Sequence, residues 1–163
     1  MIKKFIICTV MTVFCDAAHA VIKYDPTQLD HFKQTGSCPG CDLSSTNIDV
    51  ASGVSTPFNL QGANISHSMI SISNETLSNF TDAIAIHTNF IGNCYSQSSF
   101  RNAVLIGAHF DDANLMYTDF TGANIKEANF THADLYGSKG IDLTQGADFC
   151  DAIMPDGSKG PCK

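Results

Sequence analysis

The sequence has no tryptophan, few charged residues and none of the short motifs that position catalytic groups. It contains no G-x-S-x-G, H-E-x-x-H, phosphate-binding G-x-x-x-x-G-K-[ST] or G-x-G-x-x-G stretch, so neither a hydrolase nor a nucleotide-dependent enzyme is indicated. Only 15% of the residues are charged, and the acidic ones are scattered along the chain. We therefore predict a protein that is not an enzyme, with no catalytic residue, no cofactor and no metal site.

Long apolar runs are also missing, except for one at the N-terminus that is too short to cross a membrane. The segment "MIKKFIICTVMTVFCDAAHA" has the order of a secretory signal: Lys3 and Lys4, an apolar stretch, then Ala18-His19-Ala20. Cleavage is expected between Ala20 and Val21. Residues 1–20 are thus predicted to be a signal peptide, and the mature protein to be periplasmic or secreted with no membrane span.

Two other interpretations of this segment remain open. An N-terminal core helix would have the same apolar composition. A lipoprotein signal would lipidate Cys15, but the residue before it is Phe14, and lipoprotein signals have a small residue there.

Basic residues are in the minority, with 9 Lys and Arg against 16 Asp and Glu and a net charge of −7. Removing Asp16 from the acidic residues and Lys3 and Lys4 from the basic ones changes the net charge to −8. Such a surface repels phosphate groups, so we expect no nucleic acid partner and no anionic membrane partner.

Cysteine is present at 7 positions, and 5 of them follow the predicted signal. Cys150 and Cys162 bracket a C-terminal loop and could close it with a disulfide in an oxidising compartment. Cys38 and Cys41 have C-x-x-C spacing, for which a redox dithiol, half a zinc site and a local disulfide are alternatives. We expect the disulfide, since no second C-x-x-C pair is present, and Cys94 is left over.

A five-residue repeat dominates the rest of the chain, as in "ANLMYTDFTGANIKEANFTHADLYG" at 113–137. Stepping by five from Leu60 to Gly140 gives seventeen centres, of which fourteen are large apolar residues. An Ala, Ser or Thr stands two places before fifteen of them. The predicted core centres are Leu60, Ile65, Ile70, Phe80, Phe90, Phe100, Leu105, Phe110, Leu115, Phe120, Ile125, Phe130 and Leu135.

A period of five fits neither a strand nor a helix, but it fits a square coil. In a short extended segment, residues two apart point to the same side, so the small and the large residue both point inward. The remaining two residues form a corner. Four sides make a coil of about twenty residues, and successive coils stack at about 4.8 Å, the strand spacing.

The pattern resembles the pentapeptide repeat family, whose fold is an all-β, right-handed quadrilateral β-helix. The resemblance implies coils over residues 43–149, with an insertion between Ile48 and Leu60. Residues 21–42 are expected to form an N-terminal cap with a short helix that starts after Asp25 and stops at Gly36, and residues 150–163 a C-terminal tail loop. Some family members mimic duplex DNA and protect DNA gyrase, which is an alternative function for this chain.

One centre breaks the pattern, because Glu75 cannot lie unpaired in an apolar core. We expect the backbone near "SISNETL", residues 71–77, to bulge and to bury Ile72 or Leu77 in its place.

Stacking coils of twenty residues also predicts which outward side chains are neighbours. Ile84 and Ile86 flank one centre, and Val104 and Ile106 flank the centre one coil later, so all four should point outward as one apolar patch. The patch predicts an interface for a protein partner or a homodimer; alternatively, a local change of register turns some of these side chains inward. His67 and His87 are stacked in the same way and could bind a metal, but no third ligand is evident, so we favour a solvated pair.

Overall fold

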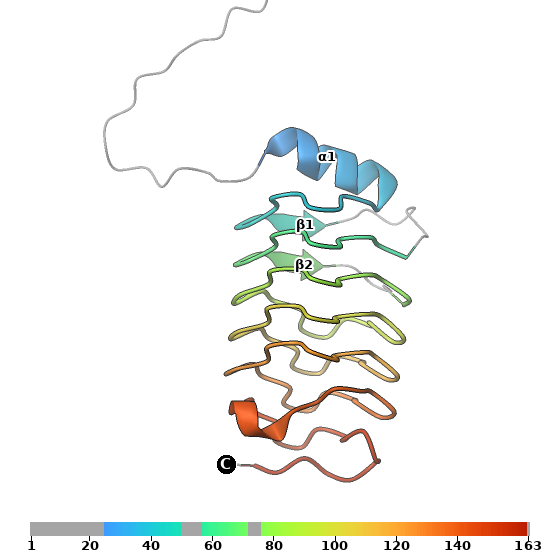
Figure 1. Cartoon of the computed structure of the whole chain (residues 1–163), viewed down its shortest axis with the longest axis vertical. Coiled ribbons are helices and arrows are strands. Elements are labelled where there is room, and N and C mark those ends of the chain that lie inside the picture. Colours follow the sequence, from blue (N-terminus) through green and yellow to red (C-terminus); the bar gives the residue numbers. More distant parts are fainter. Residues whose placement is uncertain (1–24, 50–56, 72–75, 163) are drawn as a thin grey trace, which may run out of the picture.

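The computed structural model describes residues 25–49, 57–71 and 76–162. Its regular elements are helix α1 (Pro26–Thr35), strands β1 (Asn47–Asp49) and β2 (Met69–Ser71), and the 3-10 helix η1 (Leu143–Gln145). Figure 1 shows the described residues that follow α1 winding into a column of stacked coils, with α1 at one end and the C-terminus at the other. The fold is the predicted right-handed quadrilateral β-helix with a short N-terminal helix.

Helix α1 begins and ends as its sequence indicates. The Asp25 side chain accepts a hydrogen bond from the Thr27 N–H at 2.9 Å, and hydrogen bonds from Thr27 lower the pKa of this carboxyl. At the other end Gly36 has a φ of 69°, and its N–H donates to the Phe32 carbonyl at 2.7 Å. The buried Phe32 ring lies 5.3 Å from Phe58, so the helix covers the apolar end of the first coil.

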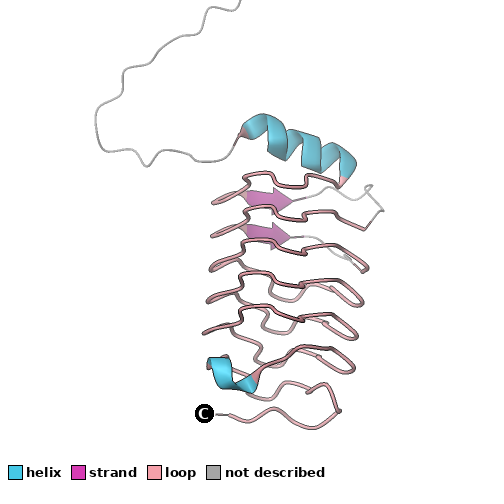
Figure 2. Ribbon diagram, in the orientation of Figure 1, coloured by secondary structure: helices cyan, strands magenta, loops and turns pink. Residues whose placement is uncertain are grey.

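Most sides of the described coils are very short extended segments that pair in parallel with the side one coil later, and Figure 2 shows strands only at β1 and β2. Strand β1 pairs with β2, and the other sides pair as isolated bridges such as Val104 with Asn124. The Leu105 N–H donates to the Asn124 carbonyl at 2.8 Å, and the Asn124 N–H donates to the Ala103 carbonyl at 2.9 Å. These bonds satisfy the backbone of neighbouring coils without long strands.

The corners are tight turns whose second corner residue has a positive φ, as a type II turn requires. Glycine supplies this conformation at Gly92 and Gly122, but Asp82, Tyr117 and Glu127 also adopt it, with φ between 58° and 60°. The repeated corner therefore places non-glycine residues in the left-handed region, where they extend away from the coil.

The interior consists of the small and large residues of every repeat. All thirteen predicted core centres are at most 2% exposed. The Phe90, Phe110 and Phe130 rings stack in one column, with centroids 4.6 and 5.0 Å apart and nearly parallel planes. A second column runs through Phe80, Phe100 and Phe120.

The coils are not all the same length. Ser37 pairs with Asn59, 22 positions later, whereas Asn59 pairs with Asn79, 20 positions later. The two additional residues fall between β1 and Phe58, where the sequence indicates an insertion; residues 50–56 lie outside the described part of the chain.

One of the two alternatives for the bulge at Glu75 is wrong, and so is the expected end of the coils. Leu77 is 58% exposed because it is a corner residue with a φ of 66°, so it does not replace Glu75 in the core; Ile72 and Glu75 lie outside the described residues. The coils also do not stop at 149, since Asp134 pairs with Ile153 and Met154 is buried. A coil shortened to 19 residues brings this segment into register.

Two glutamine side chains end the ladder that contains Asn64 and Asn124. The Gln28 Oε1 atom accepts from the Asp42 N–H at 2.9 Å at the first coil. At the last coil the Gln145 Oε1 atom accepts from the Ile125 N–H at 2.8 Å, and its Nε2 donates to the Ala123 carbonyl at 3.3 Å. Its side-chain amide thus makes the two bonds that the peptide groups of a further coil would make, and the edge is closed.

Candidate interaction face

Ile84, Ile86, Val104 and Ile106 form one apolar surface, which we name the aliphatic face. It lies on the ladder in which Asp42, Asn64, Ile84, Val104 and Asn124 follow one another through parallel bridges. Ile84 and Val104 are direct bridge partners. Ile86 and Ile106 are the first corner residues after these two sides.

The side chains of the aliphatic face point outward, and the register does not change. Ala83 and Ala85, on either side of Ile84, are 1% exposed, whereas Ile84 itself is 41% exposed. The other three residues of the face are half-buried. The two stacked coils thus expose an apolar surface to water, and the neighbouring coils do not cover it.

Polar residues occupy the same positions on the coils before and after. The Asn64 Oδ1 atom accepts from the Ser66 N–H at 3.1 Å, and the Asn124 Oδ1 atom accepts from the Lys126 N–H at 3.2 Å. The same bond recurs at other corners of the solenoid where Asn or Asp stands at this position, as in Asn89 to Ile91. The corner is therefore stabilised by an acceptor just before each centre.

The aliphatic face lacks this side-chain acceptor. Ile84 and Val104 have no side-chain oxygen, so they cannot bind the N–H groups of Ile86 and Ile106. Ser66 partly compensates on one coil, since its Oγ accepts from the Ile86 N–H at 3.3 Å. Ile84 and Val104 are therefore apolar at a position where Asn64 and Asn124 each make a corner bond on the coils before and after.

We expect Val104→Asn to stabilise the protein. The new Oδ1 atom can accept from the Ile106 N–H as Asn124 does from Lys126, which contributes roughly 0.5–1.5 kcal/mol. The loss of apolar burial is small because Val104 is half-buried. Chemical denaturation measures the free energy of unfolding, and Asn124→Val is the matched control, which should destabilise by a similar amount. A destabilised Val104→Asn variant would contradict the importance of this acceptor.

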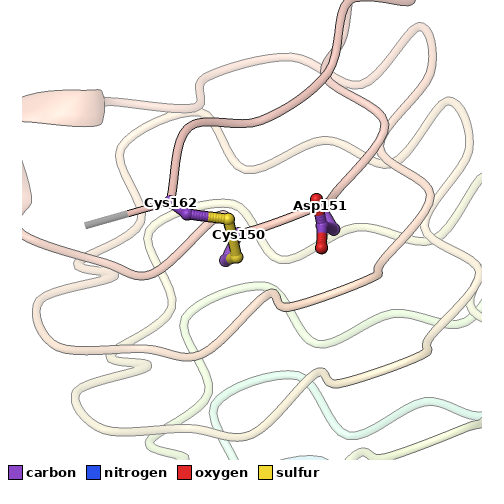
Figure 3. A group of neighbouring side chains, drawn as sticks. All are labelled: Cys150, Asp151 and Cys162. Carbon is purple, nitrogen blue, oxygen red and sulfur yellow. A yellow bond between two sulfur atoms is a disulfide. The ribbon is translucent and has the colours of Figure 1, made fainter.

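The cysteines lie at the two ends of the solenoid. Cys38 and Cys41 form a disulfide in the N-terminal cap, and Cys150 and Cys162 form one in the C-terminal segment. Figure 3 shows Asp151 near the second pair, and within the described residues these three side chains are the group of His, Cys, Asp or Glu close enough together to be considered as metal ligands. Because the two sulfur atoms are bonded to each other, this group offers no thiolate to a metal. Cys94 has no disulfide partner and is half-buried.

Two further pairs of rings lie on the corners. The His67 and His87 rings are 5.4 Å apart, as stacking by coils indicates, and Gly107 follows them in the column. Tyr117 and Tyr136, 53% and 44% exposed, are in edge-to-face contact at 5.9 Å. A spacing of twenty residues does not predict the tyrosine pair, because these two side chains belong to neighbouring positions of their corners and stand 19 residues apart.

Within the described part of the chain, no helix has the length and hydrophobicity that a membrane crossing requires. The pentapeptide repeats family model matches residues 86–116, 96–131 and 108–139. No curated protein sequence matches the chain.

Solved structures of pentapeptide repeat proteins are similar to this chain. One from the thylakoid lumen of Arabidopsis thaliana is 30% identical over 59% of this chain and 71% of that chain, with a TM-score of 0.50. HetL from the cyanobacterium Nostoc sp. strain PCC 7120, which is involved in heterocyst differentiation regulation, is 18% identical over 76% of this chain, with a TM-score of 0.53. The match spans 63% of the length of HetL.

Proposed function

The chain belongs to the pentapeptide repeat family, and we propose that it is a non-enzymatic protein–protein interaction module that acts outside the cytoplasm and docks its partner on the aliphatic face. The observation that carries this proposal is the exposure of Ile84 together with the apolar residues stacked beside it. Interfaces have an apolar centre with a polar rim, and Asn64, Asn124 and Lys126 provide such a rim.

Export is supported by two independent features. The first is the signal-like order of the N-terminal residues, with its expected cleavage before Val21. The second is the presence of disulfides Cys38–Cys41 and Cys150–Cys162, which persist in oxidising compartments such as the periplasm.

The test is the double variant Ile86→Lys/Ile106→Lys. Both side chains are at the surface, so lysine can extend into water as Lys126 does one coil later, and thermal stability should change little. Light scattering should show a smaller species, or pull-down from an envelope extract should lose the captured partner. A double variant that unfolds would contradict the proposal, because those side chains would then belong to the core.

Ile91→Lys is the matched control. Ile91 has the same position in its repeat as Ile86 and is 44% exposed, but it lies on the next corner, away from the aliphatic face. It should leave both the size of the species and the captured partner unchanged.

Cell fractionation distinguishes this proposal from the DNA-mimic alternative. The exported protein should be recovered outside the cytoplasm with Val21 as its first residue. Unprocessed protein in the cytoplasm would favour a gyrase-protecting role instead.

A further inference from the structure

We propose that the partner on the aliphatic face is a second copy of this chain, bound antiparallel about a two-fold axis. Each coil contributes one row to the ladder, which consists of a short side and the corner that follows it. The axis lies between the row of Ile84 and the row of Val104 and runs parallel to the short strands. This inference rests on the proposed function of the face as a docking surface and identifies the occupant.

The position of the aliphatic face on its ladder is the first argument. The ladder has two rows before Ile84, those of Asp42 and Asn64. It has two after Val104, those of Asn124 and the capping side chain of Gln145. The rows of Ile84 and Val104 are therefore the two central rows of the ladder. Rotation about the two-fold axis reverses the order of the rows, so the whole ladder of one copy lies on the whole ladder of the other.

The closed ends of the ladder are the second argument. A partner that added a strand to this sheet would need free backbone groups at its edge. The N–H of Asp42 is bound by Gln28, and the N–H of Ile125 and carbonyl of Ala123 are bound by Gln145. A partner must instead approach the flat side and contact side chains, as a second solenoid does.

Complementarity between the rows is the third argument. Reversal of the row order places Ile86 against Ile106 of the second copy and Ile84 against Val104. One row further out, it places the exposed His67 ring against the Glu127 carboxylate of the second copy, and the two-fold axis repeats this pair on the other side. An imidazole N–H can donate to that carboxylate, which already attracts Lys126 Nζ at 3.4 Å in its own chain.

The small size of the contact limits its strength. With about 4.8 Å between rows and about 3.3 Å per extended residue, the ladder covers roughly 25 Å by 10 Å. That is well under the roughly 800 Å² per partner of a standard specific interface, so the dimer should be weak and form in the micromolar range or above.

Cysteine cross-linking tests this arrangement at low affinity. His67→Cys and Glu127→Cys are each made in a Cys94→Ser background, and the purified proteins are oxidised separately and as an equimolar mixture. The mixture should give at least ten times more covalent dimer than either variant alone. Identical positions lie three rows apart, about 14 Å, whereas a disulfide requires Cα atoms within about 7 Å.

Adding Ile106→Lys to both variants should remove the cross-link, and adding Ile91→Lys should not. The inference is overturned if the mixture gives no more dimer than the separate proteins, or if one variant alone cross-links as strongly. If the mixture fails while Ile86→Lys/Ile106→Lys still loses a captured partner, the proposed function stands without the dimer. If the double variant also behaves like wild type in size and capture, the proposed function fails as well.

Discussion

Phe110→Ala should destabilise the protein by about 3–5 kcal/mol, the cost of removing a fully buried phenylalanine. The Phe110 ring is 0% exposed and is stacked between Phe90 at 4.6 Å and Phe130 at 5.0 Å. It also meets the edges of Phe100 and Phe120 in the neighbouring column, at 5.5 and 6.1 Å.

The cost should be near the upper end of this range because the coil cannot collapse around the cavity. The spacing between coils is fixed by backbone bonds such as Phe110 N–H to Asn129 carbonyl at 2.7 Å and Phe90 N–H to His109 carbonyl at 2.8 Å. Closing the gap would require these rows to move, so most of the volume of the lost ring would stay empty.

Chemical denaturation of Phe110→Ala and Ile91→Ala compares the free energy of unfolding that is lost at an inward position with that lost at an outward position. Ile91 is 44% exposed, so its truncation should cost at most about 1 kcal/mol. Equal losses for the two variants would contradict the assignment of inward and outward positions.

The interior could be predicted from the sequence because each repeat independently indicates which of its residues point inward. Phe90, Phe110 and Phe130 stand twenty residues apart, and each has a small residue two places before it, so one register explains all of them. An error at a single repeat would turn a phenylalanine outward. The same spacing of twenty residues places Ile84 beside Val104, so the outward aliphatic face follows from the sequence alone.

The ends of the solenoid could not be predicted in this way, because the contacts there do not repeat. Gln145 closes an edge through a side-chain amide, a role that no neighbouring repeat shares and no spacing indicates. The shortened coil before Asp148 depends on η1, whose Asp142 cap holds the Thr144 N–H at 2.9 Å. Nor could the position of Leu77 be predicted from its hydrophobicity, since the corner backbone directs it outward.

The C-terminal edge depends on a hairpin that Cys150–Cys162 holds in place, and removing this disulfide should release it. The segment folds back so that Ile153 pairs antiparallel with Lys159. The Met154 N–H donates to the Ser158 carbonyl at 2.8 Å, and the Gly160 N–H donates to the Ala152 carbonyl at 2.7 Å. This is a very short pairing, and such a hairpin is only marginally stable without further support.

The disulfide is one source of that support. Closing a loop of about a dozen residues reduces the entropy of the open state and contributes about 3 kcal/mol. A further link is an ion pair between Lys159 and Asp151, in which the hydrogen bond from Lys159 lowers the pKa of the Asp151 carboxyl. Surface pairs of this kind contribute little to stability.

In Cys150→Ser/Cys162→Ser, hydrogen exchange at the Met154 and Gly160 amides should accelerate roughly a hundredfold, since every 1.4 kcal/mol is a factor of ten. Amides in the central coils, such as that of Leu105, should keep their protection because each coil is bonded to both neighbours. The uncovered edge at residues 152–154 should also cause association that increases with protein concentration, as unpaired strand edges do.

Cys94→Ser, which removes a cysteine without a disulfide, is the control and should match wild type in both measurements. Unchanged exchange at Met154 and Gly160 in the double variant would mean that the hairpin holds by its backbone bonds alone.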